Sequence, residues 1–473
     1  MVSELLFSKQ KRLDILFYLM IVFALIGPSL GVPISDGFNL TFFRIAFLLV
    51  AAGIALRFAA EKKLETSYMY PVRWYGAFFL FWFAYGVIAL SWSASLSAGV
   101  RYLFLLGMML PLAYSFPFFL KSTDYFWKTL RILFWVFAAI ILFAVFESIT
   151  LIHLPQSRAF GRLSASVTSV FRNQNDLATC ITLGLPFLAS SFYMLDLKRK
   201  HKWFIYIIGI LSIYTLIATG SRSNTFFALP LAALPLVVLL PQVMDRSKIT
   251  LKNVFKAIIA VLVAFILANG LSMVFLSAEA REQAKTKLSS TFGFLMDVQN
   301  SPWTVEEGGE DPIDAETGRS ATVRKFLIIN GLRFLHQSHY MGVGPGNVEV
   351  YMDGAPKVDK VNMHNWWGEV LVNFGVIIFI LYMSLYFLML WRLWKLASLK
   401  HSPELNPVLR WGAYATIAAL TGYFFGGMAP STAIHYTPMW ICYGIGLAII
   451  AIGETLKKKH SGSEREKGSL EGV

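Results

Sequence analysis

The stretch Met363-His364-Asn365-Trp366-Trp367-Gly368-Glu369 combines an imidazole, an amide, two indoles and a carboxylate where a long polar segment meets an apolar run. An imidazole moves a proton near neutral pH, and a carboxylate beside hydrocarbon costs free energy unless it is used. We therefore expect chemistry at a membrane surface, with His364 as the base. On a helix, Glu369 shares a face with Asn365 rather than with His364, so it is not expected to orient the imidazole. The alternative is an N-cap with an interfacial tryptophan belt.

Arginine is the second residue type that indicates chemistry, because its planar guanidinium pairs with phosphate through two donors and stays charged near hydrocarbon. Arg222 lies in a tight turn between two apolar runs, and Arg324 interrupts a short amphipathic segment. We expect both to bind a diphosphate. The alternative is that such arginines snorkel to water or pair with carboxylates. The same two possibilities apply to Arg44, Arg101, Arg158, Arg162, Arg172, Arg319 and Arg333.

Two further motifs contain candidate donor-binding residues. Arg172-Asn173-Gln174-Asn175-Asp176 precedes an apolar run, and Arg172, Asn173 and Asn175 are candidates for binding the diphosphate or glycan. Alternatively, Asn175 or Asp176 caps the following helix. In the stretch 342–347, Gly-Val-Gly-Pro-Gly-Asn, the amides of Gly344 and Gly346 are candidates, although the motif lacks the strand and ending of a Walker loop. A tight turn that positions its neighbours is the favoured interpretation.

The composition shows which elements must position these residues. The chain has 473 residues, of which 56% are apolar and 15% charged, a balance typical of a polytopic, all-α membrane protein. Neither of its 2 cysteines is expected to bind a metal or act in catalysis. About twelve transmembrane helices are predicted near residues 13–32, 38–60, 75–92, 98–120, 128–152, 175–195, 203–220, 224–241, 254–276, 366–391, 409–428 and 437–454.

The charge pattern predicts how the helices are oriented. Most of the 42 Lys and Arg residues fall in alternate connecting segments, which are therefore expected to be cytoplasmic together with both termini. The net charge of +14 follows mainly from this bias, so nucleic acid is not an expected partner. The predicted units are nine helices over 1–276, an extracytoplasmic loop over 277–363, three helices over 364–456 and a cytoplasmic tail over 457–473.

The large predicted loop over 277–363, between predicted helices 9 and 10, is expected to contain an extramembrane unit. Its first part is a helix-like stretch followed by an acidic, flexible one. Residues 320–337 then predict an interfacial helix with Val323, Phe326, Leu327 and Phe334 near one face. By this topology Arg222, Arg324 and His364 lie on the same side of the membrane. Two cations and one base suit group transfer from a lipid diphosphate, the cations stabilising the leaving phosphate and the base taking a hydroxyl proton.

The order of these motifs over roughly residues 160–390 resembles the O-antigen ligase and polymerase superfamily. The resemblance is carried by Gly-Ser-Arg in an outer turn, an arginine-bearing segment before Gly-Val-Gly-Pro-Gly-Asn, His-Asn before a carboxylate, and Arg-Asn-Gln-Asn-Asp-Leu. It implies a C-type membrane glycosyltransferase that uses undecaprenyl-diphosphate-linked glycan without a nucleotide sugar, cofactor or essential metal. The functional arginines and histidine of the family correspond to Arg222, Arg324 and His364.

Two departures from the family pattern refine this expectation. Trp366-Trp367 replaces an aliphatic or single-aromatic pair, and His339-Tyr340 stands where His-Pro is common. The tryptophans resemble polymerase-like members of Gram-positive envelopes, such as teichuronic acid polymerisation proteins. The leading prediction is therefore a surface-polysaccharide polymerase acting on the outer face of the cytoplasmic membrane, with lipid-linked glycan, acceptor glycan, the bilayer and other polysaccharide-export proteins as partners.

Two alternatives remain open. A ligase would transfer finished glycan to lipid A core, a wall polymer or a protein by similar chemistry. A flippase or secondary transporter would also suit about twelve helices, but the sequence has no inverted hydropathy repeat, and its charged residues gather at the outer rim rather than at mid-membrane.

Overall fold

The computed structural model describes most of the chain. The described residues are 2–27, 30–35, 38–162, 164–278, 281–282, 320–358, 360–430 and 433–470, with side chains over the same ranges except 2–10, 33–39, 320–322 and 460–470. Arg319, a predicted donor-binding residue, lies outside the described residues, as does the acidic stretch of the large loop.

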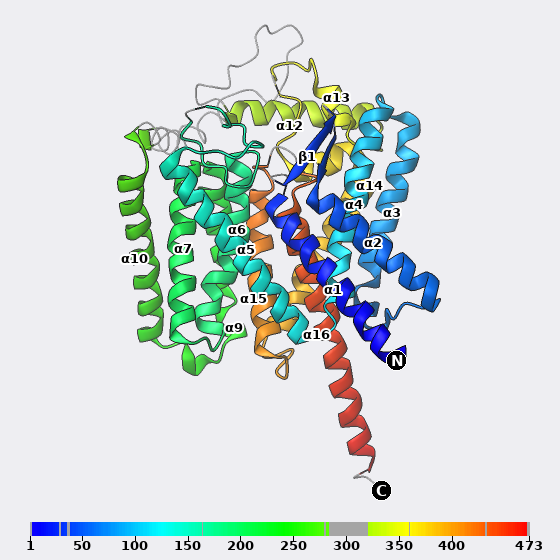
Figure 1. Cartoon of the computed structure of the whole chain (residues 1–473), viewed down its shortest axis with the longest axis vertical. Coiled ribbons are helices and arrows are strands. Elements are labelled where there is room, and N and C mark those ends of the chain that lie inside the picture. Colours follow the sequence, from blue (N-terminus) through cyan, green and yellow to red (C-terminus); the bar gives the residue numbers. More distant parts are fainter. Residues whose placement is uncertain are drawn as a thin grey trace.

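The described chain is a helical bundle, as the composition predicts (Figure 1). Its longer helices are α1 Val2–Ile26, α2 Phe42–Glu61, α3 Arg73–Ala89, α4 Leu96–Phe119, α5 Thr123–Thr150, α6 Gln174–Met194, α7 Arg199–Thr219, α8 Leu229–Val238, α10 Leu251–Phe275, α12 Ser320–Gln337, α14 Trp366–Ala397, α15 Pro407–Gly426 and α16 Thr437–Leu470. The shorter elements are β1 Gly31–Ser35, β2 Phe38–Thr41, η2 Ser67–Val72, η3 Leu90–Trp92, η4 Ser223–Ala228, α9 Leu240–Val243, η5 Arg246–Lys248 and α13 Asn347–Met352.

Local chemistry explains where several helices begin. Ser95, Ser122 and Thr250 each occupy the N-cap position, where a side-chain oxygen accepts a backbone N–H from the first turn. Such a bond satisfies one of the donors that a helix end leaves without an intrahelical partner. The apolar runs between these caps then determine the length of each helix.

Nine helical segments in the described chain are long and apolar enough to cross a membrane. The predicted number of about twelve is higher than this count. The remaining predicted runs correspond to α1, to the continuous helix Ser223–Val238 and to α15, so each predicted run contains a helix. That all of these cross the bilayer remains a prediction.

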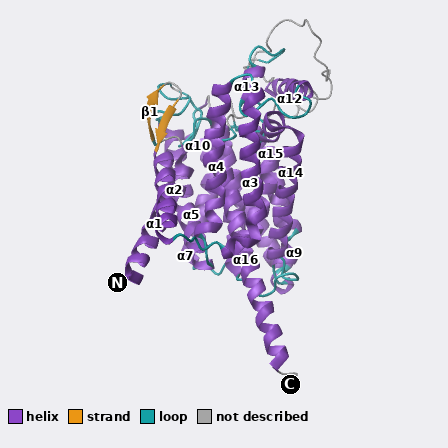
Figure 2. Ribbon diagram, turned by 90° about the vertical axis from the view of Figure 1, so that its right-hand side faces the viewer, coloured by secondary structure: helices purple, strands orange, loops and turns teal. Residues whose placement is uncertain are grey.

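The structure departs from the predicted helices at several points. Residues 38–41 form β2 rather than the start of a spanning helix, and β2 pairs antiparallel with β1, Val32 opposite Leu40 (Figure 2). The helix expected to end near 454 continues to Leu470. Within α14, Gly375 has φ 78° and ψ 179°, which breaks the helix that the apolar run predicts to be continuous.

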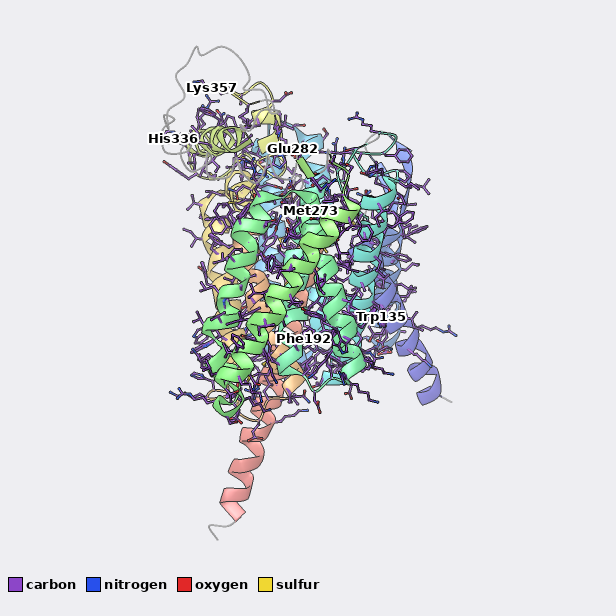
Figure 3. All side chains as sticks on the ribbon, turned by 90° about the vertical axis from the view of Figure 1, so that its left-hand side faces the viewer. Trp135, Phe192, Met273, Glu282, His336 and Lys357 are labelled. Carbon is purple, nitrogen blue, oxygen red and sulfur yellow. The ribbon has the colours of Figure 1, made fainter. Side chains whose placement is uncertain are left out.

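The two ends of the bundle differ in structure. Both termini lie at one end, while α12, α13 and the β1–β2 hairpin lie at the other, which we name the α12 end (Figures 1 and 2). Helix α12 runs across the ends of the longer helices (Figure 1), and its bounds match the predicted segment 320–337. His336 and Lys357 lie at the α12 end, whereas Trp135 and Phe192 lie nearer the other end (Figure 3).

A loop from the α12 end bonds to the backbone at the break in α14. Val343 N–H donates to the Val372 carbonyl at 2.9 Å, and Val376 N–H donates to the Tyr340 carbonyl at 3.0 Å. These bonds satisfy backbone groups that the break removes from the helical ladder, which matters because unsatisfied backbone groups are costly in hydrocarbon. Tyr340 has φ 64°, a conformation closed to proline, so a His-Pro pair could not adopt this backbone.

Candidate active site

The turn that carries Arg222 is held by a buried amide. Gly220 ends α7 with φ 60°, as its predicted role in the turn requires. Asn224 is fully buried and donates to Thr179 Oγ1 at 3.1 Å and to Ser221 Oγ at 3.0 Å. Arg222 then precedes the π-helical turn η4, a rare helix type that is frequent at functional sites.

Helix α12 brings Arg324 to the same place. The predicted apolar face is confirmed, because Val323, Phe326, Leu327 and Phe334 are all buried. Arg324 Nη1 donates to Ser223 Oγ at 3.0 Å, next to Arg222 in sequence. Burial and then the positive charge of Arg222 lower the pKa of Arg324, and burial lowers that of Arg222. The two guanidinium groups are therefore close enough to repel one another and are partly withdrawn from water.

His364 lies beside this pair. Its backbone has φ 48°, a left-handed conformation that costs a residue with a side chain about 1–3 kcal/mol and tends to occur at active sites. Its Nδ1 is buried and has no hydrogen-bond partner among the described residues. Burial, followed by the charges of Arg324, Lys360 and Arg158, lowers the pKa of His364 to about 4. The imidazole is therefore neutral at pH 7, and its pKa lies well below the unperturbed value that the sequence alone suggests.

The two residues after His364 begin α14. Asn365 is the N-cap, and its Oδ1 accepts the backbone N–H groups of Trp367 at 3.2 Å and Gly368 at 3.3 Å. Trp366 Nε1 donates to Tyr382 Oη, while Trp367 Nε1 donates to the Phe424 carbonyl, both at 2.8 Å. Both indoles are buried in the bundle, so they do not form the membrane-facing belt that was the alternative interpretation.

Glu369 belongs to another group of side chains. Tyr102 Oη donates to Glu369 Oε1 at 2.8 Å, and Glu369 is absent from the charges that act on His364. The expectation that Glu369 does not orient the imidazole agrees with this arrangement. Burial raises the pKa of neighbouring Glu349, and the charge of Arg101 partly offsets that rise. Arg101 thus has a carboxylate nearby, as expected from the alternative interpretation in which such arginines pair with carboxylates.

The segment with Arg172 is fixed to α5 by buried hydrogen bonds to Glu147, which sequence reasoning missed. Glu147 and His153 are both buried, and His153 Nδ1 lies 2.7 Å from Glu147 Oε1. Glu147 Oε2 also accepts the Thr168 N–H at 2.8 Å. Only the position of Glu147 within an apolar run signals this role, because an isolated carboxylate there requires a partner.

This segment ends at the N-terminus of α6. The helix cap is Asn173 rather than Asn175 or Asp176, because Asn173 Oδ1 accepts both of their backbone N–H groups, at 2.9 and 3.0 Å. The cap role occupies the Asn173 amide oxygen, while Asn175 is half-buried in the first turn of α6. Arg172 is exposed, and its carbonyl accepts the N–H of Arg158 at 3.0 Å.

The glycine-rich stretch is a packed turn. Gly344 has φ 95° and Gly346 has φ 67°, and a Cβ on Gly344 would lie 1.9 Å from Ser93 Oγ. Gly344 N–H already donates to the Asn373 carbonyl at 3.0 Å, so it is not free to bind phosphate. Asn347 is fully buried and accepts the Ser95 N–H at 2.7 Å. These contacts favour the tight-turn interpretation over a phosphate cradle.

The structure thus brings Arg222, Arg324 and His364 together, two cations beside a neutral base. In the part of the chain that the structure describes, no group of three or more His, Cys, Asp or Glu side chains could hold a metal ion. The arrangement can neutralise an anion with the guanidinium groups while the imidazole takes a proton from a neighbouring hydroxyl.

Comparison with known proteins agrees with the family that the motifs resemble. Residues 207–383, which contain Arg222, Arg324 and His364, match the family described as O-antigen ligase, and the resemblance predicted from the motifs is confirmed. Over 94% of its length the chain is 25% identical to the teichuronic acid biosynthesis protein TuaE of Bacillus subtilis (strain 168), and the match covers 86% of that protein. The chain is a multi-pass membrane protein similar to the O-antigen ligase family and to a protein of teichuronic acid biosynthesis.

Proposed function

We propose that this protein polymerises undecaprenyl-diphosphate-linked oligosaccharide repeat units of a cell-surface polysaccharide, of the teichuronic acid type, on the outer face of the cytoplasmic membrane. The observation that carries the proposal is the hydrogen bond of Arg324 to Ser223 beside Arg222, with the neutral imidazole of His364 under the influence of Arg324. The similarity to TuaE supports the class of polysaccharide.

Each residue has a defined part in the transfer. The acceptor hydroxyl oxygen forms a bond to the anomeric carbon of the donor glycan, and the bond between that carbon and the diphosphate oxygen breaks. The bonding electron pair leaves with the lipid diphosphate, whose charge Arg222 and Arg324 neutralise. The hydroxyl proton goes to His364. The bonds formed and broken and the proton transfer balance without a cofactor.

The test uses purified membranes supplied with lipid-linked repeat units. His364→Ala is expected to lower kcat by about 10²–10⁴, the usual contribution of a general base. Arg222→Gln is expected to lower kcat by about 10²–10³, the usual cost of losing one group that stabilises developing charge. His336→Ala is a matched control, because His336 is an exposed histidine at the same end of the molecule (Figure 3). Polymer of normal length and rate from both site variants would contradict the site.

Ligation is the second candidate, because the family that matches residues 207–383 is described as O-antigen ligase. A ligase uses the same donor and the same three side chains but a different acceptor. Deletion of the gene distinguishes polymerisation from ligation. Accumulation of single lipid-linked repeats supports polymerisation, whereas a full ladder of lipid-linked chains that are not attached to an acceptor supports ligation.

A further inference from the structure

A cavity of about 750 Å³ lies among α5, α6, α7, α15 and α16, and we name it the α5–α7 cavity. Its lining is mostly apolar, with side chains that include Leu130, Phe137, Leu183, Phe187 and Ile441. The volume falls within the range of about 300–1,000 Å³ that small-molecule sites occupy. Arg222, Arg324 and His364 do not line this cavity, so it is separate from the candidate active site.

Aromatic rings join the helices around the cavity. The Trp127 and Trp411 ring centroids lie 6.0 Å apart, which joins α5 to α15, and the Phe187 and Trp411 rings, also 6.0 Å apart, join α6 to α15. The Trp135 and Phe204 rings, 5.2 Å apart, join α5 to α7. All five rings line the cavity, so it is a pre-formed space with packed walls.

The cavity opens toward the end of the bundle that holds both termini, which we name the terminus end. Four of its lining residues are exposed, namely Arg131, Trp135, Lys200 and His201. The first two lie in the first half of α5, and the other two lie in the first turn of α7. Trp135 lies nearer the terminus end, as does Phe192, which comes shortly before the start of α7 (Figure 3). The mouth of the cavity is therefore between α5 and α7 at this end.

The cavity extends from this mouth toward the middle of the bundle. On α6 the lining side chains run from Ser191 back to Cys180, roughly 16 Å at a rise of 1.5 Å per residue. This length is about half of the hydrocarbon core of a bilayer, which is about 30 Å thick. Cys180, Leu183 and Ser191 are all buried. The depth and polarity of the cavity therefore suit an acyl chain of a lipid from one leaflet.

The mouth is positively charged. Arg131 and Lys200 are cations, and the His201 ring has an N–H donor in either charge state. Neither aspartate nor glutamate lines the cavity, and within the described ranges no carboxylate forms an ion pair with Arg131 or Lys200. The nearest acids in sequence, Asp124 and Asp196, are exposed and lie outside the lining. An anionic group at the mouth would therefore meet donors and no competing carboxylate.

The charge bias of the connecting segments does not explain both cations. Lys200 belongs to the basic run 198–202, for which that bias accounts. Arg131 instead lies eight residues into α5, a helix long and apolar enough to span a membrane. A charge on such a helix is costly beside hydrocarbon unless it reaches water or a partner. A lipid phosphate is a partner that suits the planar guanidinium group.

We propose that the α5–α7 cavity binds one anionic phospholipid from the leaflet at the terminus end, with an acyl chain in the cavity and the phosphate on Arg131 and Lys200. An anionic head is favoured over a zwitterionic one, because a choline ammonium would lie beside two cations. This site is independent of the proposed polymerisation, since the residues that line it take no part in the transfer.

Lipid selectivity tests the head-group contacts. Purified full-length protein in detergent is titrated with dioleoyl phosphatidylglycerol or dioleoyl phosphatidylcholine, and bound lipid is counted by native mass spectrometry. The wild type is expected to bind the first phosphatidylglycerol about tenfold more tightly than phosphatidylcholine, and Arg131→Gln/Lys200→Gln is expected to lose this preference. Equal affinity of the wild type for the two lipids would overturn the site.

The matched control is Lys128→Gln/Arg199→Gln, which removes the same charge from the same two helices. Lys128 and Arg199 are exposed and do not line the cavity, so this variant should keep the preference. Both double variants replace exposed side chains and are expected to elute as folded protein in size-exclusion chromatography. An equal loss of preference in both variants would show that general surface charge, and not the mouth of the cavity, selects the lipid.

A competition arm distinguishes a lipid from a free phosphate. Glycerol 3-phosphate carries a phosphate but has no acyl chain to enter the cavity, so it is expected to displace phosphatidylglycerol only weakly. Displacement by equal concentrations of glycerol 3-phosphate would overturn the lipid assignment.

A photoreactive phosphatidylglycerol with a diazirine in its acyl chain locates the bound chain. Cross-links are expected on α6 between Cys180 and Ser191 in the wild type and in the control variant, and about tenfold fewer in Arg131→Gln/Lys200→Gln. Helix α10 reports lipid around the protein, because its Val261 and Ile266 side chains are 55% and 68% exposed, and it should be labelled equally in all three proteins. Labelling of α10 without α6 in the wild type would overturn the cavity site.

Discussion

His364 is held in a state that suits a base and not an acid. Three cations and burial favour the neutral imidazole, and its Nδ1 lacks a hydrogen-bond partner among the described residues. A low pKa weakens the base in the free protein. An anionic diphosphate bound by Arg324 would cancel part of the field that lowers this pKa, so the donor would strengthen the base at the step that needs it.

The pH dependence of the reaction tests this coupling. Only neutral His364 can take a proton, so activity is lost as pH falls through its pKa. For the free enzyme the acidic limb of kcat/KM should lie near the pKa of about 4. With donor bound the pKa is higher, so the acidic limb of kcat should lie at higher pH. In Arg324→Gln, which removes the charge with the largest effect on this pKa, the residual kcat/KM limb should move up part of the way toward the ordinary histidine value, because burial still lowers the pKa. If the acidic limbs of kcat and kcat/KM fall at the same pH in the wild type, the coupling between donor binding and the pKa of His364 is contradicted.

At the scale of elements, the buried pair Glu147–His153 determines where the segment with Arg158 and Arg172 lies. Glu147 is fully buried and accepts hydrogen bonds from His153 and from Thr168. Removing Glu147 leaves several buried donors without an acceptor, and this is more costly than losing a surface ion pair.

Glu147→Ala is therefore expected to lower the free energy of unfolding by about 3–5 kcal/mol. The control is Glu61→Ala, because Glu61 pairs with Arg57 at 3.0 Å at the surface, where an i,i+4 pair contributes about 0.3–0.5 kcal/mol. Thermal unfolding of both variants in detergent gives the comparison. Equal shifts in Tm would show that the buried pair does not fix the segment.

The turn at residues 342–347 is a second positioning element, joined to both α4 and the break in α14. Gly344→Ala is expected to destabilise the protein by about 1–3 kcal/mol through overpacking against Ser93. Gly161→Ala is the matched control, since Gly161 also has a positive φ of 72° but no atom within 4 Å of its Cβ position. Ser93→Ala should recover part of the loss. Similar losses at both glycines would show that backbone strain, and not the contact, sets the cost.

At the scale of the whole molecule, the two ends of the bundle should face opposite sides of the membrane. Cys180 and Cys442 are both buried, which leaves the protein without a reactive native thiol. A membrane-impermeant maleimide should label Lys357→Cys at the α12 end in intact cells, because the proposed site faces outward. Lys248→Cys, in a segment predicted to be cytoplasmic, should react only after permeabilisation. The reverse pattern would place the site on the cytoplasmic side.

The sequence predicts much of this architecture because spanning helices depend on local composition. Apolar length predicts helices close to their observed bounds, and the amphipathic pattern predicts α12 at residues 320–337. The sequence also identifies candidate residues for chemistry, since Arg222, Arg324 and His364 are polar groups beside hydrocarbon. What stays hidden is which of several possible short-range contacts the surrounding packing selects. The β1–β2 pairing, the Glu147–His153 pair and the choice of Asn173 as cap follow from packing that no local pattern encodes.

The break at Gly375 has a consequence for how the protein tolerates different lipids. Spanning helices respond to bilayer thickness by tilting. In an uninterrupted α14, a tilt would carry the helix start and His364 with it. Gly375 instead divides the helix, and residues 340–344 hold the part before the break through backbone bonds to Val372 and Asn373. The Tyr340 carbonyl also accepts the N–H of Val376, just after the break. The loop from the α12 end therefore anchors the start of α14 and the imidazole independently of the long spanning portion, so catalysis should vary little with acyl-chain length.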